Sequence, residues 1–303
     1  MAQLNQLKPY YNTIVVIPVG PGSCTDFIAD TINSFIYYNQ LTYRIILADD
    51  SHQGIGTAIA SYYPGVEVIP TRKPMGGWAG LYITLALAFR HAIENYRFSV
   101  LLKLDTDALV IGSNPQQEIL QHLTLNPLIG IAGQYPLDYH GKPWNIKWPQ
   151  QRILNGTRTW KFFRRPIANW QLIKLYRQAL KNGYLTGESV FGGAYFMSEA
   201  LLIKLFNSGL LPNYSFLSLN LGEDHIFSLL AKSLGFDLEN LSSNGLPFGC
   251  AWKGLPVSPE KLLQDKKKII HSVRFWNDLN EAEIRTYFKN RRDLNSQFNI
   301  PDF

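Results

Sequence analysis

Residues 101–110, LLKLDTDALV, place two carboxylates one residue apart, at Asp105 and Asp107, between apolar runs. The apolar run before Asp105 predicts a buried strand over residues 99–104. Two close carboxylates repel each other, and a divalent cation offsets that repulsion because Mg²⁺ and Mn²⁺ prefer oxygen ligands. Asp is also common in turns, so the motif alone favours a turn and a metal site about equally.

The chain around this motif alternates strands and helices. Apolar, β-branched runs predict buried strands, and apolar residues at helical spacing predict helices. The predicted strands cover residues 13–19, 43–48, 66–69 and 99–104, and the predicted helices cover residues 25–38 and 78–95. This alternation is typical of a parallel sheet with helices on both faces. We therefore predict an α/β fold with a mostly parallel central sheet flanked by helices.

The second half of the sequence is less regular. Aromatic residues, prolines and basic residues are frequent over residues 136–165, which predicts loops there. The remaining patterns predict strands at 129–134 and 192–197 and helices at 170–181 and 222–235. A glycine pair, Gly192-Gly193, begins the second of these strands.

Composition excludes several classes of protein. The 303 residues are 46% hydrophobic, which is too apolar for a disordered chain and sufficient for a large core. The net charge of +6 is a mild excess that does not indicate a nucleic-acid-binding protein. The two cysteines, Cys24 and Cys250, are in no metal-binding spacing, and a disulfide framework is not expected.

The sequence also predicts where the protein is located. The N-terminus has no signal-like segment, and no apolar run reaches the ~20 residues of a membrane span. We expect a cytoplasmic protein with no transmembrane helix. The lysines at 266–268 are predicted to form a solvated face, which leaves peripheral contact with an anionic membrane open.

Three polar or glycine clusters follow predicted strands or precede helices: Asp49-Asp50, Gly76-Gly77 and Asp105-Thr106-Asp107. Ligands in open α/β sheets bind beyond the carboxyl ends of the strands, because loops and helix N-termini converge there. The three clusters are therefore predicted to share one cleft.

At this point the sequence resembles the glycosyltransferases of the GT-A fold, most closely those of family 2. The segments VVIPVG, IILADDS, TRKPMGGWAGLYITLALAFRHAI and LLKLDTDALV occur in the order typical of that family, although KPMGGW departs from the usual asparagine-containing pattern. The resemblance implies a single GT-A-type catalytic domain over residues 1–303. It divides into a nucleotide-binding half at about 10–110, an acceptor-binding half at about 111–275, and a C-terminal helical tail at 276–303.

The resemblance also implies which residues bind a nucleotide-sugar donor. Strand ends and the glycine loop hold the donor in that family, and the matching residues here are Pro18, Val19, Asp49, Asp50, Arg72, Gly77, Trp78 and Asp105. The alternative for Asp49 and Asp50 is a strand-end turn that caps the next segment.

The metal and catalytic residues are assigned in the same way. The resemblance implies that Asp105 and Asp107 hold Mn²⁺ or Mg²⁺ in a DxD motif and that His271 is a further ligand, although a lone histidine is more often a surface or packing residue. The segment LGEDHIF contains Glu223-Asp224 at a predicted helix start. Asp224 is the candidate catalytic base and Glu223 the second candidate, while acidic residues in a first helical turn also simply favour the helix dipole. His225 is a weaker candidate for orienting the base.

The sequence thus predicts an enzyme: a metal-dependent glycosyltransferase, as in polysaccharide biosynthesis, that moves a sugar from a UDP- or GDP-sugar to a saccharide or lipid-linked acceptor with inversion. Trp252 is the first candidate for an acceptor contact among the seven tryptophans. A sugar-phosphate nucleotidyltransferase is less favoured, because GPGS after the first strand lacks a basic residue. A non-catalytic carbohydrate-binding protein of the same fold is the third alternative.

Overall fold

The computed structural model describes residues 8–157 and 166–298. Its central sheet contains β1 (Tyr10–Val19), β2 (Tyr43–Asp49), β3 (Val66–Pro70), β4 (Arg97–Leu104), β6 (Ile129–Gly133), β7 (Ala194–Ser198) and β8 (Asp237–Asn240). These seven strands lie in the order β3-β2-β1-β4-β7-β6-β8. Neighbours run parallel except at β7, which is antiparallel to β4 and β6. The predicted α/β fold with a mostly parallel sheet is confirmed.

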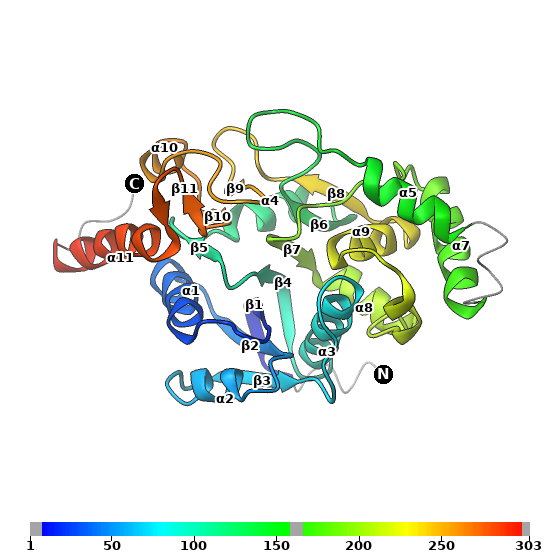
Figure 1. The fold of residues 1–303 in the computed structure, drawn as a ribbon, viewed down its shortest axis with the longest axis horizontal. Coiled ribbons are helices and arrows are strands. Elements are labelled where there is room, and N and C mark those ends of the chain that lie inside the picture. Colours follow the sequence, from blue (N-terminus) through cyan, green and yellow to red (C-terminus); the bar gives the residue numbers. More distant parts are fainter. Residues whose placement is uncertain (1–7, 158–165, 299–303) are drawn as a thin grey trace.

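Helices cover both faces of this sheet. In chain order they are α1 (Thr25–Tyr38), α2 (Ile55–Ala60), α3 (Ala79–Asn95), α4 (Gln117–Leu125), α5 (Lys147–Gly156), α7 (Pro166–Lys181), α8 (Glu199–Asn207), the short 3₁₀ helix η2 (Tyr214–Ser218), α9 (Glu223–Ser233), α10 (Pro259–Gln264) and α11 (Glu281–Phe298). Figure 1 shows α1 and α3 on opposite sides of the strands.

The alternation of side chains along β1 explains why its apolar run is continuous. Ile14 and Val16 pack into the core formed with α3 and α9, whereas Val15 and Ile17 pack into the core formed with α1. Successive side chains of a strand point to opposite faces. Both faces of β1 are therefore buried, as its sequence predicts.

A smaller sheet positions the residues that follow β4. It consists of β5 (Ala108–Val110), β10 (Ile269–His271) and β9 (Phe248–Cys250), in the order β5-β10-β9. A two-stranded ribbon, β11 (Phe275–Trp276) with β12 (Leu279–Asn280), follows β10. Ile284 and Phe288 of α11 pack with residues of the small sheet in a separate core. The last helix is thus fixed against the region that carries the DxD motif.

Two local predictions are wrong. The loop predicted over residues 136–165 contains α5, whose Pro149 and Ile153 are buried; residues 158–165 lie outside the described part of the chain. The solvated face predicted for the lysines at 266–268 is also incorrect at Lys267, although Lys266 is exposed. Lys267 is buried and donates to the carbonyl oxygens of Ser242, Ser243 and Leu246. A lysine can be buried here because three acceptors replace its water.

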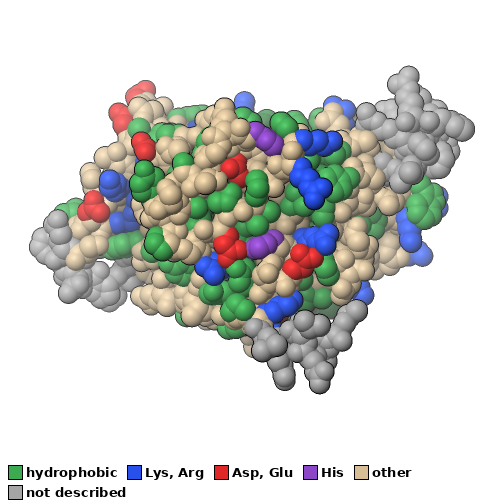
Figure 2. Space-filling view, turned by 90° about the horizontal axis from the view of Figure 1, so that it is seen from below, with side chains coloured by type: hydrophobic (Ala, Val, Ile, Leu, Met, Phe, Trp, Pro, Cys, Tyr) green, Lys and Arg blue, Asp and Glu red, His purple; other side chains and the backbone are tan. Residues whose placement is uncertain are grey.

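Charge on the visible surface is mixed. On the face shown in Figure 2, Lys and Arg side chains are spread among Asp, Glu and His side chains and do not form a single patch. Among residues 8–157 and 166–298, the helices lack the combination of length and apolarity that crossing a membrane requires.

Candidate active site

The DxD motif forms the connection between the two sheets. Leu104 ends β4 and Ala108 begins β5, so Asp105-Thr106-Asp107 spans the gap. The amide of Asp105 donates to the carbonyl oxygen of Gly193, and the amide of Ala108 donates to that of Asp105, both at 3.0 Å. Val16 of β1 pairs with Lys103 of β4, and both strands end at the same edge of the sheet. The motif therefore lies where the fold predicts a ligand.

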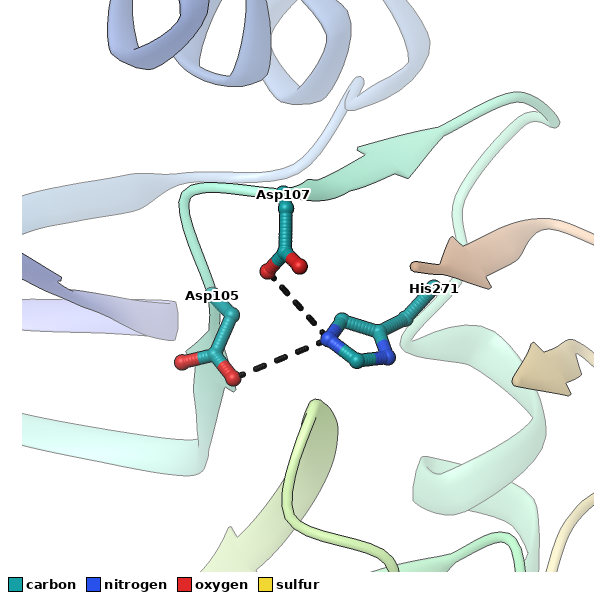
Figure 3. Close-up of side chains that lie close together, drawn as sticks. All are labelled: Asp105, Asp107 and His271. Atoms are coloured by element: carbon teal, nitrogen blue, oxygen red, sulfur yellow. Dashed lines mark ion pairs between the residues drawn. The ribbon is translucent and has the colours of Figure 1, made fainter. Parts of the chain in front are cut away.

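The pairing of β10 with β5 brings His271 to this motif. The two strands are antiparallel, and His271 pairs with Ala108, the residue after Asp107. The Nε2 atom of His271 lies 3.2 Å from Oδ1 of Asp107 and 3.8 Å from Oδ2 of Asp105 (Figure 3). Its Nδ1 atom lies 3.0 Å from the carbonyl oxygen of Ala251. When a cation is bound, a proton on Nδ1 would satisfy that carbonyl and leave the Nε2 lone pair free to coordinate; without a cation, Nε2 can donate to Asp107.

The second oxygen of each carboxylate is held by a protein donor. Lys103 Nζ lies 2.6 Å from Oδ1 of Asp105. Ser272 Oγ donates to Oδ2 of Asp107 at 2.9 Å, and Arg274 Nε lies 2.8 Å from the same oxygen. Such outer contacts orient metal ligands. One oxygen of each aspartate is thereby left facing the imidazole.

The donor set fits a divalent cation. One ligand atom each from Asp105, Asp107 and His271 lies within 4.8 Å of the others. Burial acts to raise the pKa of Asp107, but the hydrogen bond and charge of His271, together with Arg274 and Ser272, outweigh it and hold the pKa well below its usual range. The carboxylate is therefore ionised at neutral pH. Two carboxylate oxygens are ligands that suit Mn²⁺ or Mg²⁺, and an imidazole nitrogen is a ligand typical of transition metals.

Glu223 and Asp224 begin α9 and have different environments. Glu223 is buried, and its Oε1 lies 3.4 Å from Lys103 Nζ. Burial raises the pKa of Glu223 to about 8, although the Lys103 charge acts against it. Asp224 is more exposed; its Oδ1 accepts a hydrogen bond from the backbone N–H of His225 at 2.8 Å and lies 4.0 Å from the His225 ring nitrogen Nε2. At neutral pH Glu223 retains its proton for most of the time, which leaves Asp224 as the available carboxylate.

The glycine pair before β7 joins these two groups of residues. A Cβ atom on Gly193 would overlap the ring of His271. A Cβ atom on Gly192 would lie 3.0 Å from Oε1 of Glu223 and 3.2 Å from Oδ2 of Asp224. The candidate metal ligand His271 and the candidate base Asp224 therefore pack against adjacent glycines of one backbone segment, where a larger residue would displace them. The glycine pair is visible in the sequence, but its function could not be inferred there.

Lys103 is the functional residue that the sequence interpretation missed. Its side chain is fully buried and donates to the carbonyl oxygen of Gly192, besides its contacts with Asp105 and Glu223. Burial lowers the pKa of Lys103, but the charges of Asp105 and Glu223 outweigh this and keep it raised. The available signal was a single charged residue within the apolar run LLKL, since a lysine on a buried strand needs a partner.

The predicted donor residues Asp49 and Asp50 hold their own loops together. Asp49 accepts hydrogen bonds from the amides of Ser51 at 2.8 Å and Gly56 at 3.0 Å. Asp50 accepts from the amides of Met75 and Gly76, at 2.9 and 2.8 Å, and from the Thr71 hydroxyl. The strand-end turn is thus realised at Asp49, whereas Asp50 holds the loop at residues 71–76. A contact of either residue with a nucleotide remains a prediction.

The other predicted donor residues lie at two places. Pro18 and Val19 end β1 and pair with Ala48 and Asp49, at the edge of the sheet that carries the DxD motif. Arg72, Gly77 and Trp78 are exposed on the loop that leads into α3. Trp78 lines the same cavity as Asp224 and packs against Trp148 with ring centroids 5.0 Å apart.

Comparison with known proteins gives similar structures but no sequence relatives. No protein-family model matches the chain, and no curated protein matches it either. A mannosyltransferase, PcManGT from Pyrobaculum calidifontis in complex with GDP-Man and Mn²⁺, is similar with 13% identity and a TM-score of 0.45. The match covers 79% of this chain and 59% of that protein.

Two further glycosyltransferases are similar at the same level. The galactosyltransferase LgtC, in complex with donor and acceptor sugar analogues, has 12% identity and a TM-score of 0.45, over 93% of this chain and 95% of that one. The bifunctional enzyme WbbM has 9% identity and a TM-score of 0.44, over 93% of this chain and 50% of that one. These likenesses are too distant to assign an activity, a donor or an acceptor to this chain.

Proposed function

We propose that this protein is a metal-dependent glycosyltransferase that transfers a sugar from a UDP- or GDP-sugar to an acceptor hydroxyl with inversion. The observation that carries the proposal is the position of Gly192-Gly193 between two chemical groups. On one side lies the cluster of Asp105, Asp107 and His271, and on the other lie Glu223 and Asp224. Displacement at a sugar carbon needs both groups close together.

The first group would bind the donor diphosphate. Asp105, Asp107 and His271 would hold Mn²⁺ or Mg²⁺, which when bound neutralises charge on the diphosphate and so stabilises it as a leaving group. Pro18 and Val19 end the neighbouring strand at the same edge of the sheet, which supports their predicted place beside the nucleoside. The order of the motifs in the sequence supports a family 2 type of enzyme.

The second group would activate the acceptor. In an inverting displacement the acceptor oxygen attacks the anomeric carbon, the bond from that carbon to the phosphate oxygen breaks, and the hydroxyl proton moves to a carboxylate. The raised pKa of Glu223 keeps that carboxyl largely protonated at neutral pH. Asp224 is therefore proposed as the base, and Lys103 as the residue that positions Glu223 and Asp105.

Titration calorimetry tests the donor site. GDP or UDP is expected to bind in MnCl₂, to lose binding when EDTA replaces the metal, and to lose it in Asp107→Ala. Asp278→Ala, at an exposed carboxylate, is the matched control and should bind as the wild type does. Binding of equal strength without metal would remove the DxD cluster from donor recognition.

Product analysis then tests the reaction. A panel of nucleotide sugars should yield free nucleoside diphosphate with the wild type, and Asp224→Asn should bind the donor but transfer no sugar. A fully active Asp224→Asn variant would exclude Asp224 as the base. Formation of pyrophosphate from a nucleoside triphosphate and a sugar phosphate would instead identify a nucleotidyltransferase.

A further inference from the structure

A cavity of about 510 Å³ opens beside Asp224 and is lined by aromatic rings. Its tryptophans come from separate parts of the chain: Trp78 precedes α3, Trp144 and Trp148 lie before and within α5, and Trp252 follows β9. Glu223 and Asp224 line the same cavity. The proposed base thus faces an aromatic-lined space, and no residue of the DxD cluster lines it.

Three of the four tryptophan rings pack against neighbouring aromatic rings. Trp144 stacks on Phe191 with ring centroids 5.1 Å apart and an interplanar angle of 12°. Trp78 leans on Trp148. Trp252 is nevertheless 72% exposed and Trp78 is 56% exposed. Four tryptophans gathered around one cavity form a continuous aromatic patch, and a patch of this kind indicates a binding surface, unlike a single exposed ring.

The charge of the lining restricts what can bind. Among the described residues of the cavity, Glu223 and Asp224 are the acidic ones, and neither lysine nor arginine lines it. Lys253 lies over the Trp252 ring at 5.0 Å from its centroid, and Arg152 lies 5.4 Å from the centroid of the Trp148 ring, both outside this lining. Glu223 contacts the buried Lys103 and is largely protonated at neutral pH, so Asp224 is the carboxylate that would repel an anionic ligand here, and a neutral ligand avoids that repulsion.

The space continues past Trp78. That residue also lines an adjoining cavity of about 580 Å³, together with the neutral amides of Asn155 and Asn220 and with Arg152. Amides match sugar hydroxyls because they both donate and accept hydrogen bonds. A ligand that extends across Trp78 would therefore find aromatic faces at one end and amides at the other.

We propose that the cavity at Asp224 is the acceptor subsite and that it takes a neutral oligosaccharide, whose apolar ring faces stack on Trp252 and Trp78. This inference rests on the proposed function, since it identifies the acceptor of that same reaction. The aromatic lining would favour the C–H faces of a sugar, and the carboxylate of Asp224 would disfavour uronic acids and lipid diphosphates at this position. The hydroxyl that reacts is the one presented to Asp224.

Binding without turnover tests the proposal. Saturation-transfer NMR would be recorded with the methyl glycosides of maltose, cellobiose and lactose, and with cellobiouronic acid and geranyl diphosphate as anionic probes. At least one neutral disaccharide should bind more tightly than both anionic probes. Trp252→Ala should weaken that binding by at least about fivefold, the range expected for loss of one stacking partner, and Trp252→Phe should restore most of it. Preferred binding of geranyl diphosphate or cellobiouronic acid, or no binding of a neutral disaccharide, would overturn the proposal.

Trp170→Ala is the matched control. Trp170 is 57% exposed on α7 and lines a different cavity, so its loss should leave disaccharide binding unchanged. Equal weakening in Trp170→Ala and Trp252→Ala would refute the subsite. Release of nucleoside diphosphate by the wild type, measured separately with each nucleotide sugar, tests the proposed function itself, because sugar binding is recorded without a donor.

Discussion

The ammonium group of Lys103 lies 3.4 Å from Oε1 of Glu223, and the lysine side chain is fully buried. The same nitrogen lies 2.6 Å from Oδ1 of Asp105. One buried cation is therefore shared by a candidate metal ligand and by the neighbour of the candidate base. Charges taken out of water are tolerated only when they are paired, so each of these groups depends on the others.

Replacing Lys103 by methionine should destabilise the protein by about 3 to 5 kcal/mol, because the half-buried carboxylate of Asp105 loses its cation and the buried carboxyl of Glu223 loses its polar contact, while the volume is kept. Urea unfolding monitored by circular dichroism measures this loss. The double variant Lys103→Met/Asp105→Asn should recover part of it, since the stranded carboxylate of Asp105 is then replaced by a neutral amide. A loss below about 1 kcal/mol in the single variant would show that the lysine is not the structural partner of these groups.

Glu223 should make the stability fall as pH rises. Its pKa is raised by burial from 4.5 to about 8 in the folded protein. Between these values the folded state keeps a proton that the unfolded state has released, so the contribution of Glu223 is fully present below about 4.5 and is lost as pH rises toward about 8. Glutamine does not titrate, so the unfolding free energy of the wild type should fall relative to that of Glu223→Gln as pH rises across this interval. Measuring both proteins at several pH values tests this. A difference that does not change with pH would contradict the raised pKa.

Much of the fold could be predicted because local patterns and tertiary packing agree in the first half. The apolar run at 13–19 is buried on both faces of β1, and the helix expected at 25–38 coincides with α1. The helix α5 was missed because aromatic residues and a proline obscured a short apolar face that is completed by α7 and other neighbours.

The candidate site could be predicted only in part. Asp105, Asp107 and His271 come together as expected, but the cause of their proximity, the pairing of β10 with β5, is a contact between distant segments that no local pattern reveals. Lys103 was missed for a related reason. A charge within an apolar run can be explained only when its partners are known, and Glu223 lies 120 residues away along the chain.

His271 should be required for metal binding. In His271→Ala the imidazole nitrogen is lost while the two aspartates remain. The affinity for Mn²⁺ should therefore fall by at least about tenfold, since removing even an outer contact of a metal ligand typically has an effect of that size. Calorimetric titration with MnCl₂ measures it. His140→Ala, at an exposed histidine beside Tyr139, is the control and should keep the wild-type affinity. Unchanged affinity in His271→Ala would remove the histidine from the metal site.

The two glycines before β7 should have separable effects. In Gly193→Ala the new Cβ overlaps the His271 ring, which cannot shift easily because β10 is fixed between β5 and β9. In Gly192→Ala the Cβ instead meets the carboxylates of Glu223 and Asp224 at 3.0 and 3.2 Å. Contacts this close force the neighbouring side chain to move. The side chain that moves is His271 in Gly193→Ala, and Glu223 or Asp224 in Gly192→Ala.

We therefore expect Gly193→Ala to weaken Mn²⁺ binding by at least about tenfold, and Gly192→Ala to keep that affinity but lower the rate of sugar transfer. Calorimetry with MnCl₂ and a transfer assay at saturating metal distinguish the two effects. Both variants should remain folded, which circular dichroism checks, because the added methyl groups face the site and not the main cores. Equal Mn²⁺ affinity in the two variants, or the reverse order, would contradict the assignment of one glycine to the metal ligands and the other to the base.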